Sequence, residues 1–223
     1  MNAERSSPKL KILIVDDHTL VREALAAQLS RQEGFEVVDT LPSADNLFTR
    51  VSELKPDLIL MDIDMPGMIC FDAAHRLNSL DDPPRIIFVS AFFHDHYIEQ
   101  ALRVRARGYV VKSDEPSVLI EAIREVASGG SYFSEQVRAR LMVDDDGVEL
   151  AAKGKTVVSL LTQREIEVLR YIAQGLPKKE IARTMHLSVK TVENHSARLM
   201  AKLNIHDRVE LARFAIREGL AEA

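Results

Sequence analysis

The sequence contains a single cysteine and no long apolar run. Cys70 cannot form an internal disulfide, which favours a reducing compartment. No run approaches the roughly 20 apolar residues that a membrane helix needs, and the polar stretch from Met1 to Lys9 lacks the apolar core of a signal peptide. Repeats and low-complexity segments are absent as well. We therefore expect a cytoplasmic protein without a membrane segment.

Charge is distributed unevenly along the 223 residues. Residues 1–130 contain 14 Lys and Arg against 21 Asp and Glu, a balance of −7, whereas residues 156–223 contain 11 against 8, a balance of +3. Hydrophobic residues make up 46% of the chain, which is enough for a substantial core. An acidic N-terminal part and a basic C-terminal part indicate two domains with different partners.

Apolar runs alternate with helical patterns through the first 130 residues. The run Leu58–Met61 shows no alternation of polar and apolar residues, as expected of a strand buried on both faces of a parallel sheet. The other predicted strands are 12–15, 35–38, 86–89 and 109–111, and the predicted helices are 20–32, 44–54, 71–80, 95–104 and 117–128. This alternation predicts an α/β doubly wound, five-stranded parallel sheet.

The last block of the sequence has helical patterns only. Thr162 and Glu165 have the spacing of a capping box, Ser188 is a plausible N-cap, and Asp207 opens a final helix. Residues 136–143 could add a helix before an acidic tether at 144–147. We therefore expect an α/β domain over 1–133, a linker over 134–157, and an all-α domain of four helices over 158–223, with a helix-turn-helix arrangement over 178–203.

Polar side chains follow four of the predicted strands, namely Asp16, Asp17, Asp62, Ser90 and Lys112. Because the carboxyl ends of neighbouring parallel strands meet at one edge of a sheet, we expect these groups to share a crevice. Two carboxylates about 4 Å apart repel by roughly 4 kcal/mol at an effective dielectric constant near 20, so a cluster of three needs cations. Lys112 supplies one positive charge, and a hard divalent ion, Mg²⁺ or else Mn²⁺, would supply the rest.

Such a site is suited to receiving a phosphoryl group. Asp62 would attack phosphorus in line, while the metal ion and Lys112 neutralise the transferred oxygens and Ser90 donates a hydrogen bond. The product would be an aspartyl phosphate.

The order of the acid pair, an Asp in a D-x-x-M-P-G context, a Ser and G-Y-V-V-K resembles the receiver domain of two-component response regulators, over about residues 9–130. The resemblance implies a flavodoxin-like fold in which Asp62 is the phosphoacceptor. It implies that Mg²⁺ is bound by Asp17, Asp62 and the backbone carbonyl of Asp64, with Asp16 assisting through water. The roles of the remaining residues follow in the same way: Ser90 and Lys112 contact the phosphoryl group, and Tyr109 is the aromatic switch partner of Ser90.

The predicted helix 189–203 has an inward face made of Val192, His195, Ser196, Leu199 and Leu203. The opposite face is free to enter a major groove, where Asn194 can read a base edge and small residues permit close approach. The candidate DNA-binding residues are Lys178, Lys179, Lys190, Thr191, Glu193, Asn194, Ala197, Arg198 and Lys202, of which the lysines and the arginine would neutralise phosphates.

Residues 158–221 resemble the LuxR-type DNA-binding domain. The segments that carry this resemblance are L-T-Q-R-E-I-E-V-L, G-L-P-K-K-E-I-A and S-V-K-T-V-E-N-H. With the receiver, they resemble a regulator of the NarL/FixJ family. This implies three partners: a sensor histidine kinase, double-stranded operator DNA, and a second copy of the chain after phosphorylation, with helix 207–218 helping to pair the domains. Many relatives have lysine at position 193, so we expect Glu193 to accept from a cytosine amine or to pair with Lys190.

Other interpretations fit parts of the pattern. Asp62-Ile63-Asp64 could mimic the Asp-x-Asp motif of haloacid dehalogenase-type phosphatases, but that class carries it on the first strand and needs further acids downstream. A receiver that works without phosphate is the second alternative, and the full acidic set argues against it. His94-Asp95-His96 has the composition of a metal motif without matching ligands elsewhere, which favours a surface loop. We therefore expect a transcription regulator and not an enzyme.

Overall fold

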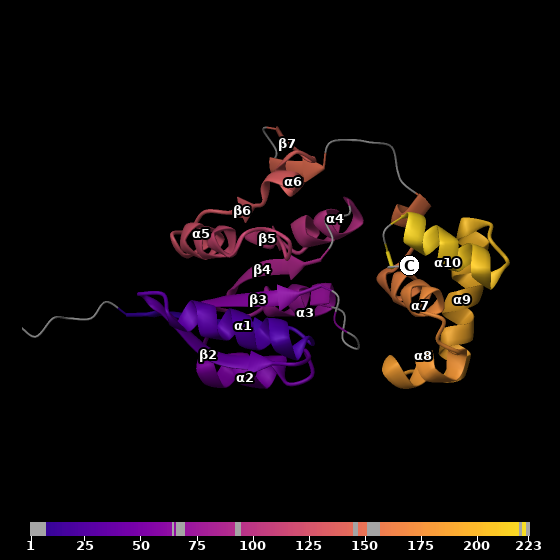
Figure 1. Cartoon of the computed structure of the whole chain (residues 1–223), viewed down its shortest axis with the longest axis horizontal. Coiled ribbons are helices and arrows are strands. Elements are labelled where there is room, and N and C mark those ends of the chain that lie inside the picture. Colours follow the sequence, from indigo (N-terminus) through magenta and orange to yellow (C-terminus); the bar gives the residue numbers. More distant parts are fainter. Residues whose placement is uncertain are drawn as a thin grey trace, which may run out of the picture. The chain divides into compact units, whose positions relative to one another are not determined.

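The computed structural model describes residues 8–63, 65, 70–91, 95–144, 147–150, 157–218 and 220–221. The chain divides into two compact units, Met1–Glu149 and Leu150–Ala223, whose elements are labelled in Figure 1. Within this described part, every helix is too short or too polar to span a membrane.

The first unit is built on a parallel sheet of six strands in the order β2-β1-β3-β4-β5-β6. The strands are β1 Leu10–Val15, β2 Phe35–Leu41, β3 Leu58–Asp62, β4 Arg85–Ser90, β5 Gly108–Val111 and β6 Tyr132–Phe133. The helices are α1 Thr19–Ser30, α2 Leu47–Leu54, α3 Cys70–Leu77, α4 Asp95–Arg103, α5 Pro116–Ala127 and α6 Glu135–Arg138. The five predicted strands and five predicted helices are therefore confirmed, with ends that shift by no more than three residues.

Helices cover both faces of this sheet. On one face, Leu29 of α1 and Ile123 of α5 join Leu60 of β3 in a common core cluster. On the other face, Phe71 of α3 packs against Phe88 of β4, with ring centroids 4.8 Å apart. Residues 58–61 of β3 are at most 1% exposed, which confirms the prediction of a strand buried on both faces.

The sixth strand differs from the predicted five-stranded sheet. Strand β6 has two residues, and it adds to β5 with Gly108 opposite Tyr132 and Tyr109 opposite Phe133. Two residues are too few for any hydrophobic periodicity, so no pattern in the sequence indicates this strand.

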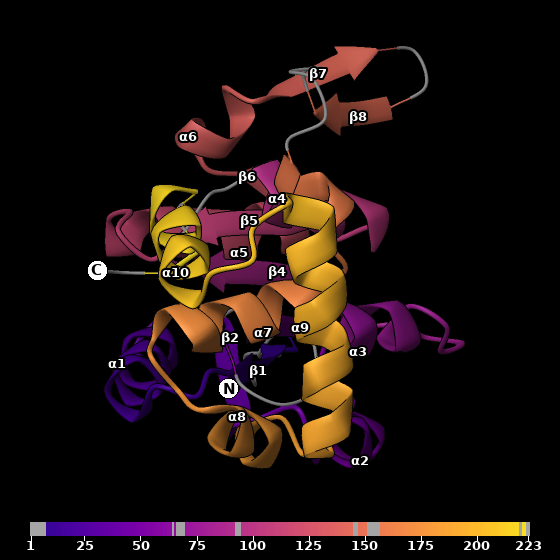
Figure 2. The same ribbon diagram turned by 90° about the vertical axis from the view of Figure 1, so that its right-hand side faces the viewer.

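The segment after β6 also differs from the expected helix over 136–143. Helix α6 ends at Arg138. A two-stranded sheet of β7 Leu141–Asp144 and β8 Gly147–Leu150 follows it (Figure 2). Each of these runs has only four residues, which is too few for a helical pattern to be told from a strand pattern.

The second unit is helical. It contains a short 3₁₀ turn, η1 Val157–Leu160, followed by α7 Gln163–Ala173, α8 Lys178–Thr184, α9 Val189–Leu203 and α10 Arg208–Arg217. The predicted caps are confirmed: Thr162 and Glu165 form a capping box, Ser188 accepts from the backbone N–H of Thr191, and Asp207 caps α10. The apolar faces of the four α-helices share one core cluster, which includes Leu169, Ile181, Leu199 and Leu211.

Gly108 permits the close approach of β6 to β5. A Cβ atom at this position would lie 3.0 Å from the carbonyl oxygen of Tyr132 and 3.0 Å from Cγ1 of Ile87. We expect Gly108→Ala to destabilise the first unit by about 1–3 kcal/mol, because the added methyl group overpacks this contact. Urea unfolding of the full-length protein measures the change. Ser113→Ala, at an exposed loop position, should stay within about 0.5 kcal/mol, and equal midpoints for the two variants would contradict the packing argument.

Candidate functional site

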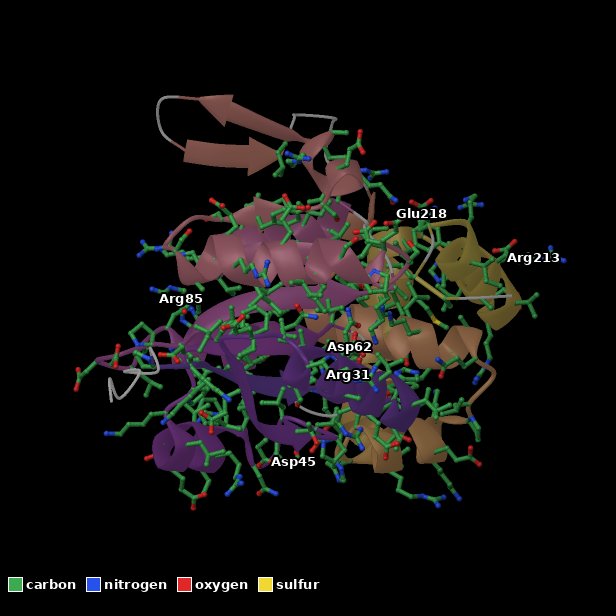
Figure 3. The ribbon with its side chains drawn as sticks, turned by 60° about the vertical axis from the view of Figure 1, so that its left-hand side comes forward. Arg31, Asp45, Asp62, Arg85, Arg213 and Glu218 are labelled. Atoms are coloured by element: carbon green, nitrogen blue, oxygen red, sulfur yellow. The ribbon has the colours of Figure 1, made fainter. Side chains whose placement is uncertain are left out.

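The predicted site residues of the first unit lie at the carboxyl edge of the sheet. Asp62 is the last residue of β3, Ser90 is the last residue of β4, and Lys112 directly follows β5. Asp16 follows β1, which neighbours β3 in the sheet. Asp62 and Arg85, at the start of β4, mark opposite edges of the sheet in Figure 3. The ends of these strands therefore lie at one edge of the sheet, as expected from the sequence.

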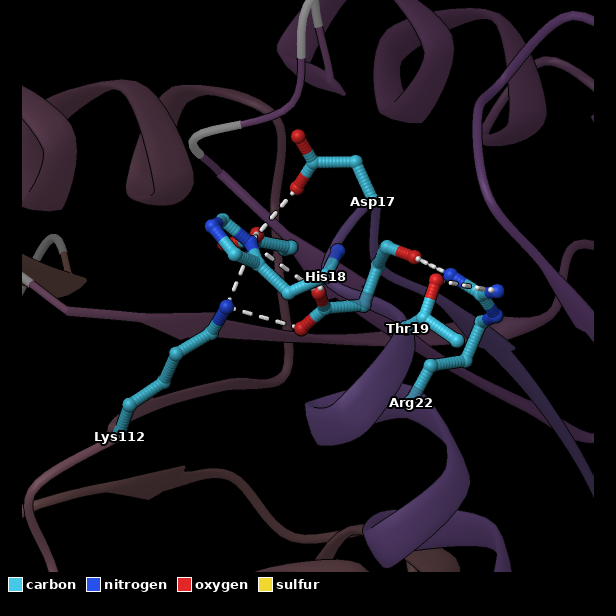
Figure 4. A network of polar contacts seen from close by, with 7 residues as sticks. Asp17, His18, Thr19, Arg22 and Lys112 are labelled. Carbon is cyan, nitrogen blue, oxygen red and sulfur yellow. Dashed lines mark hydrogen bonds and ion pairs between the residues drawn. The ribbon is translucent and has the colours of Figure 1, made fainter.

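Lys112 joins two of the carboxylates. Its Nζ atom lies 2.8 Å from Oδ2 of Asp16 and 2.9 Å from Oδ2 of Asp62. Figure 4 draws contacts of Lys112 as dashed lines. Asp16 and Asp62 are only 2% and 1% exposed. Burial disfavours the charge of Lys112, but the attraction of Asp62 and Asp16 outweighs it and raises the pKa of Lys112 above its ordinary value. The amine is therefore a permanent cation of the site.

Asp16 is held rigidly at every polar atom. Its backbone N–H donates to Leu41, its carbonyl oxygen accepts from Nη1 of Arg22 at 2.7 Å, and its Oδ1 atom accepts from the backbone N–H of His18 at 2.8 Å. The Arg22 contact is also drawn in Figure 4. With Lys112 on Oδ2, these contacts fix the direction of the acid pair.

Asp17 presents an oxygen that suits a cation. Its Oδ1 atom is buried, forms no hydrogen bond in the described part of the chain, and lies 2.8 Å from Nδ1 of His18 in an ion-pair contact. A buried carboxylate oxygen that accepts no hydrogen bond has lone pairs available for a cation. Three carboxylates against one lysine leave a formal charge of −2, which matches a divalent ion with oxygen ligands. The donor set therefore fits Mg²⁺.

His18 also belongs to this cluster, although the sequence analysis did not single it out. Its Nδ1 atom lies 2.8 Å from Oδ1 of Asp17, and potential ligand atoms of Asp16, Asp17, His18 and Asp62 all lie within 4.8 Å of one another. A histidine beside a strand end is common in surface loops, so the sequence signal for it is weak.

Ser90 and Tyr109 lie on the adjacent strands β4 and β5, and both are fully buried. Tyr109 pairs with Phe88, two residues before Ser90. This burial is expected both of an ordinary core residue and of a switch residue. The predicted backbone ligand Asp64 lies outside the described residues, as does His94.

The structure also describes Cys70 and the segment of the possible metal motif. Cys70 is 2% exposed and its Sγ atom contacts the carbonyl oxygen of Ile63, so it is a small packed residue. Asp95 opens α4 and forms an ion pair with Arg140. His96 is buried against the ring of Tyr97 and is not part of a surface loop, because α4 turns it inward.

The second candidate surface is the polar face of α9. Lys190, Asn194, Ala197 and Arg198 are exposed on it, whereas Val192, Ser196, Leu199 and Leu203 are buried on the opposite face. His195 is only partly buried, and burial lowers the pKa of its imidazole. The exposed residues form the face that the sequence predicts for DNA contact.

Four of the predicted DNA-binding residues are in ion pairs. Glu193 lies between two lysines, with its carboxylate 3.7 Å from Nζ of Lys178 and 3.9 Å from Nζ of Lys190, which agrees with the expected Glu193–Lys190 pair. Lys202 instead contacts Oε2 of Glu165 at 2.6 Å. Its ammonium therefore fastens the end of α9 to the capping box of α7.

Comparison with known proteins identifies both units. The family description "Response regulator receiver domain" matches residues 12–124, and "Bacterial regulatory proteins, luxR family" matches residues 159–215. The transcriptional regulatory protein DegU of Brevibacillus brevis is 31% identical over 98% of both chains. The chain is a response regulator of the NarL/FixJ family. The regulator is also 32% identical to the response regulator protein VraR of Staphylococcus epidermidis, over 96% of this chain and 99% of VraR.

Solved structures agree with this assignment. A LuxR-family two-component response regulator from Aurantimonas sp. SI85-9A1 is 28% identical to the regulator, with a TM-score of 0.56. The matched region is 59% of the regulator and 94% of the Aurantimonas chain. The structure of RcsB from Salmonella enterica serovar Typhimurium bound to promoter rprA is 22% identical, covers 92% and 98%, and has a TM-score of 0.66, which shows the shared fold. The regulator is therefore a DNA-binding transcription regulator with a receiver domain, and receiver domains generally bind Mg²⁺.

Glu165 gives the helical unit a pH-dependent stability. Burial opposes the charge of its carboxylate, but hydrogen bonds from Lys202 and Thr162 outweigh that effect and lower the pKa of Glu165. A lowered pKa contributes stability above the unfolded-state value, near 4.5, and this contribution is lost as pH falls through the folded-state pKa.

We therefore expect the melting-temperature gap between the wild-type protein and Glu165→Gln to be largest near pH 7 and to shrink below about pH 4.5. Circular dichroism of the full-length protein between pH 3 and 7 measures it. Glu180→Gln, at an exposed position of α8, serves as the control and should show a small, constant gap. A pH-independent gap for Glu165→Gln would contradict the assigned ion pair.

Proposed function

We propose that a sensor histidine kinase phosphorylates the regulator on Asp62 and that this switches its binding to operator DNA. The observation that carries the proposal is the position of the Lys112 ammonium, within 2.9 Å of both Asp62 and Asp16 at the carboxyl edge of the sheet. A cation in that place neutralises charge on the oxygens of a phosphoryl group held beside Asp62.

In the proposed reaction, a carboxylate oxygen of Asp62 forms a bond to phosphorus while the bond from phosphorus to the kinase histidine breaks. Lys112 neutralises one phosphoryl oxygen, and the hydroxyl of Ser90 donates to another. Asp17, Asp62 and the carbonyl of Asp64 would hold Mg²⁺, with Asp16 acting through water. When bound, the ion offsets the negative charge that the transferred group adds.

The switch would run along β4 and β5. Ser90 and Tyr109 lie on these neighbouring strands, so a movement of Ser90 toward the phosphoryl group changes the space available to the buried Tyr109 ring. We propose that this rearrangement promotes pairing of two copies of the chain, with α10 assisting.

We place the regulator in the cytoplasm, because its proposed partners are a kinase and operator DNA. We also infer that it has no enzymatic turnover, because its proposed role is to bind DNA in response to phosphorylation.

At the DNA, we propose that α9 enters the major groove, with Asn194 and Glu193 near base edges and Ala197 permitting close approach. Lys178, Lys179, Lys190 and Arg198 would neutralise phosphates, and Thr191 would lie near the groove. Lys202 would contribute least, because Glu165 already compensates its charge. Two paired domains would contact half-sites about one helical turn, roughly 34 Å, apart.

Removal of the acceptor carboxylate tests the phosphorylation site. We expect Asp62→Asn to take up no phosphoryl group from acetyl phosphate and Mg²⁺, because the amide is a poor nucleophile. Intact-protein mass spectrometry detects the adduct in the wild-type protein. Asp72→Asn, at an exposed position of α3, should be labelled like the wild type. Mg²⁺-dependent labelling that persists in Asp62→Asn would refute the assignment.

Two substitutions on α9 separate DNA contact from structural support. We expect Arg198→Ala to weaken binding to a random 30-base-pair duplex several-fold and to reduce the slope of log affinity against log salt by about 1. Lys202→Ala should instead lower the melting temperature and leave the salt slope nearly unchanged. Fluorescence anisotropy with labelled DNA measures both. Arg213→Ala removes the same charge from α10, so an equal loss there would show that net charge alone is responsible.

A further inference from the structure

Residues 132–140, which follow α5, are fastened to two other elements of the first unit. The backbone N–H of Ser134 donates to the carbonyl oxygen of Tyr109 at 3.0 Å, which holds the segment on β5. Farther along, the guanidinium of Arg140 forms an ion pair with the carboxylate of Asp95, the first residue of α4. The segment 132–140 therefore contacts both β5 and α4.

We propose that the Asp95–Arg140 ion pair is a regulatory contact. It couples the position of α4 to the segment 132–140, and through that segment to the chain that leads to the second unit. The inference rests on the proposed phosphorylation of Asp62, and it names the contact that carries the signal out of the first unit.

One end of the contact lies close to the proposed switch. Ser90 is the last residue of β4 and Asp95 is the first residue of α4, so four residues separate them. The start of α4 is packed, since Tyr97 is fully buried and its ring stacks on Phe71 with centroids 6.3 Å apart. Packed elements take one discrete arrangement or another, so a movement of Ser90 toward a phosphoryl group reaches Asp95 as a shift of the helix.

The other end of the contact belongs to a segment that is packed as well. Strand β6 lies beside β5 with Tyr132 opposite Gly108, and Val137 of α6 is fully buried. The backbone N–H of Arg140 donates to the carbonyl oxygen of Val137 at 2.9 Å, so Arg140 is part of this packed turn. A shift at Arg140 therefore involves the whole segment 132–140.

Solvent reaches the ion pair, which suits a contact that opens and closes. The side chains of Arg140 and Asp95 are 40% and 35% exposed, so each charge is hydrated when the pair opens. An ion pair of this exposure adds little to the stability of a fold. Its effect is on which of two arrangements the first unit favours.

The chain continues from Arg140 straight into the connection with the second unit. Strand β7 begins at Leu141 and pairs with β8, and the division between the two units falls after Glu149. Figure 1 labels β6, α6 and β7 one after another along this part of the chain. A change in the contact between Asp95 and Arg140 therefore acts on the start of this connection.

The ratio of DNA affinities with and without beryllofluoride, a phosphoryl mimic, tests the coupling. Fluorescence anisotropy of the full-length protein with a random 30-base-pair duplex measures both affinities. We expect the ratio to fall about threefold in Arg140→Ala, because α4 is no longer linked to the segment 132–140. Arg138→Ala, at an exposed position of α6, removes the same charge and should keep the wild-type ratio. A wild-type ratio in Arg140→Ala, or an equal fall in Arg138→Ala, would overturn the inference.

A double-mutant cycle tests whether the two residues act through each other. Asp95→Asn should also lower the ratio, and the double variant with Arg140→Ala should lose no more than Arg140→Ala alone, because both substitutions break the same pair. Losses that multiply in the double variant would overturn the inference. All variants should take up a phosphoryl group from acetyl phosphate like the wild type. A wild-type protein whose DNA affinity ignores beryllofluoride would instead refute the proposed switch, and the inference with it.

Discussion

The repulsion between carboxylates gathered at one edge of a buried sheet is the constraint on which the first unit depends. Asp16 and Asp62 are almost fully buried, and Lys112 lies between them. At an effective dielectric constant near 20, two such charges about 4 Å apart repel by roughly 4 kcal/mol. Lys112 offsets part of this repulsion, while Asp17 adds a further negative charge. In the function that we propose, this surplus of negative charge attracts the divalent ion that then helps to bind the phosphoryl group.

Charge compensation also shapes the helical unit. Lys202 and Glu165 fasten the end of α9 to the start of α7, and Glu193 lies between two lysines on the face that we assign to DNA. The Lys202–Glu165 pair thus holds α9 against α7, and the carboxylate of Glu193 lowers the net positive charge of the exposed face of α9. The basic balance of the last 68 residues in the sequence is therefore divided between structural support and a surface for phosphates.

Much of the architecture was predictable because it depends on local patterns. Continuous apolar runs give the five central strands, and polar residues at or directly after the ends of β1, β3 and β5 predict the convergence of Asp16, Asp62 and Lys112. The caps at Thr162 and Ser188 follow from side-chain chemistry within one helical turn. Strand β6 and the place of His18 depend instead on contacts between distant segments. Strands β6, β7 and β8 have only two to four residues each, which is too few for a periodic pattern to indicate them.

The central claim is that Asp62 carries the phosphoryl group. Borohydride reduction of the phosphorylated full-length protein converts an acyl phosphate to an alcohol, and peptide mass spectrometry then identifies the reduced position. We expect reduction at position 62 alone, dependent on prior treatment with phosphodonor and a divalent ion. Reduction at another aspartate, with an unchanged Asp62, would contradict it.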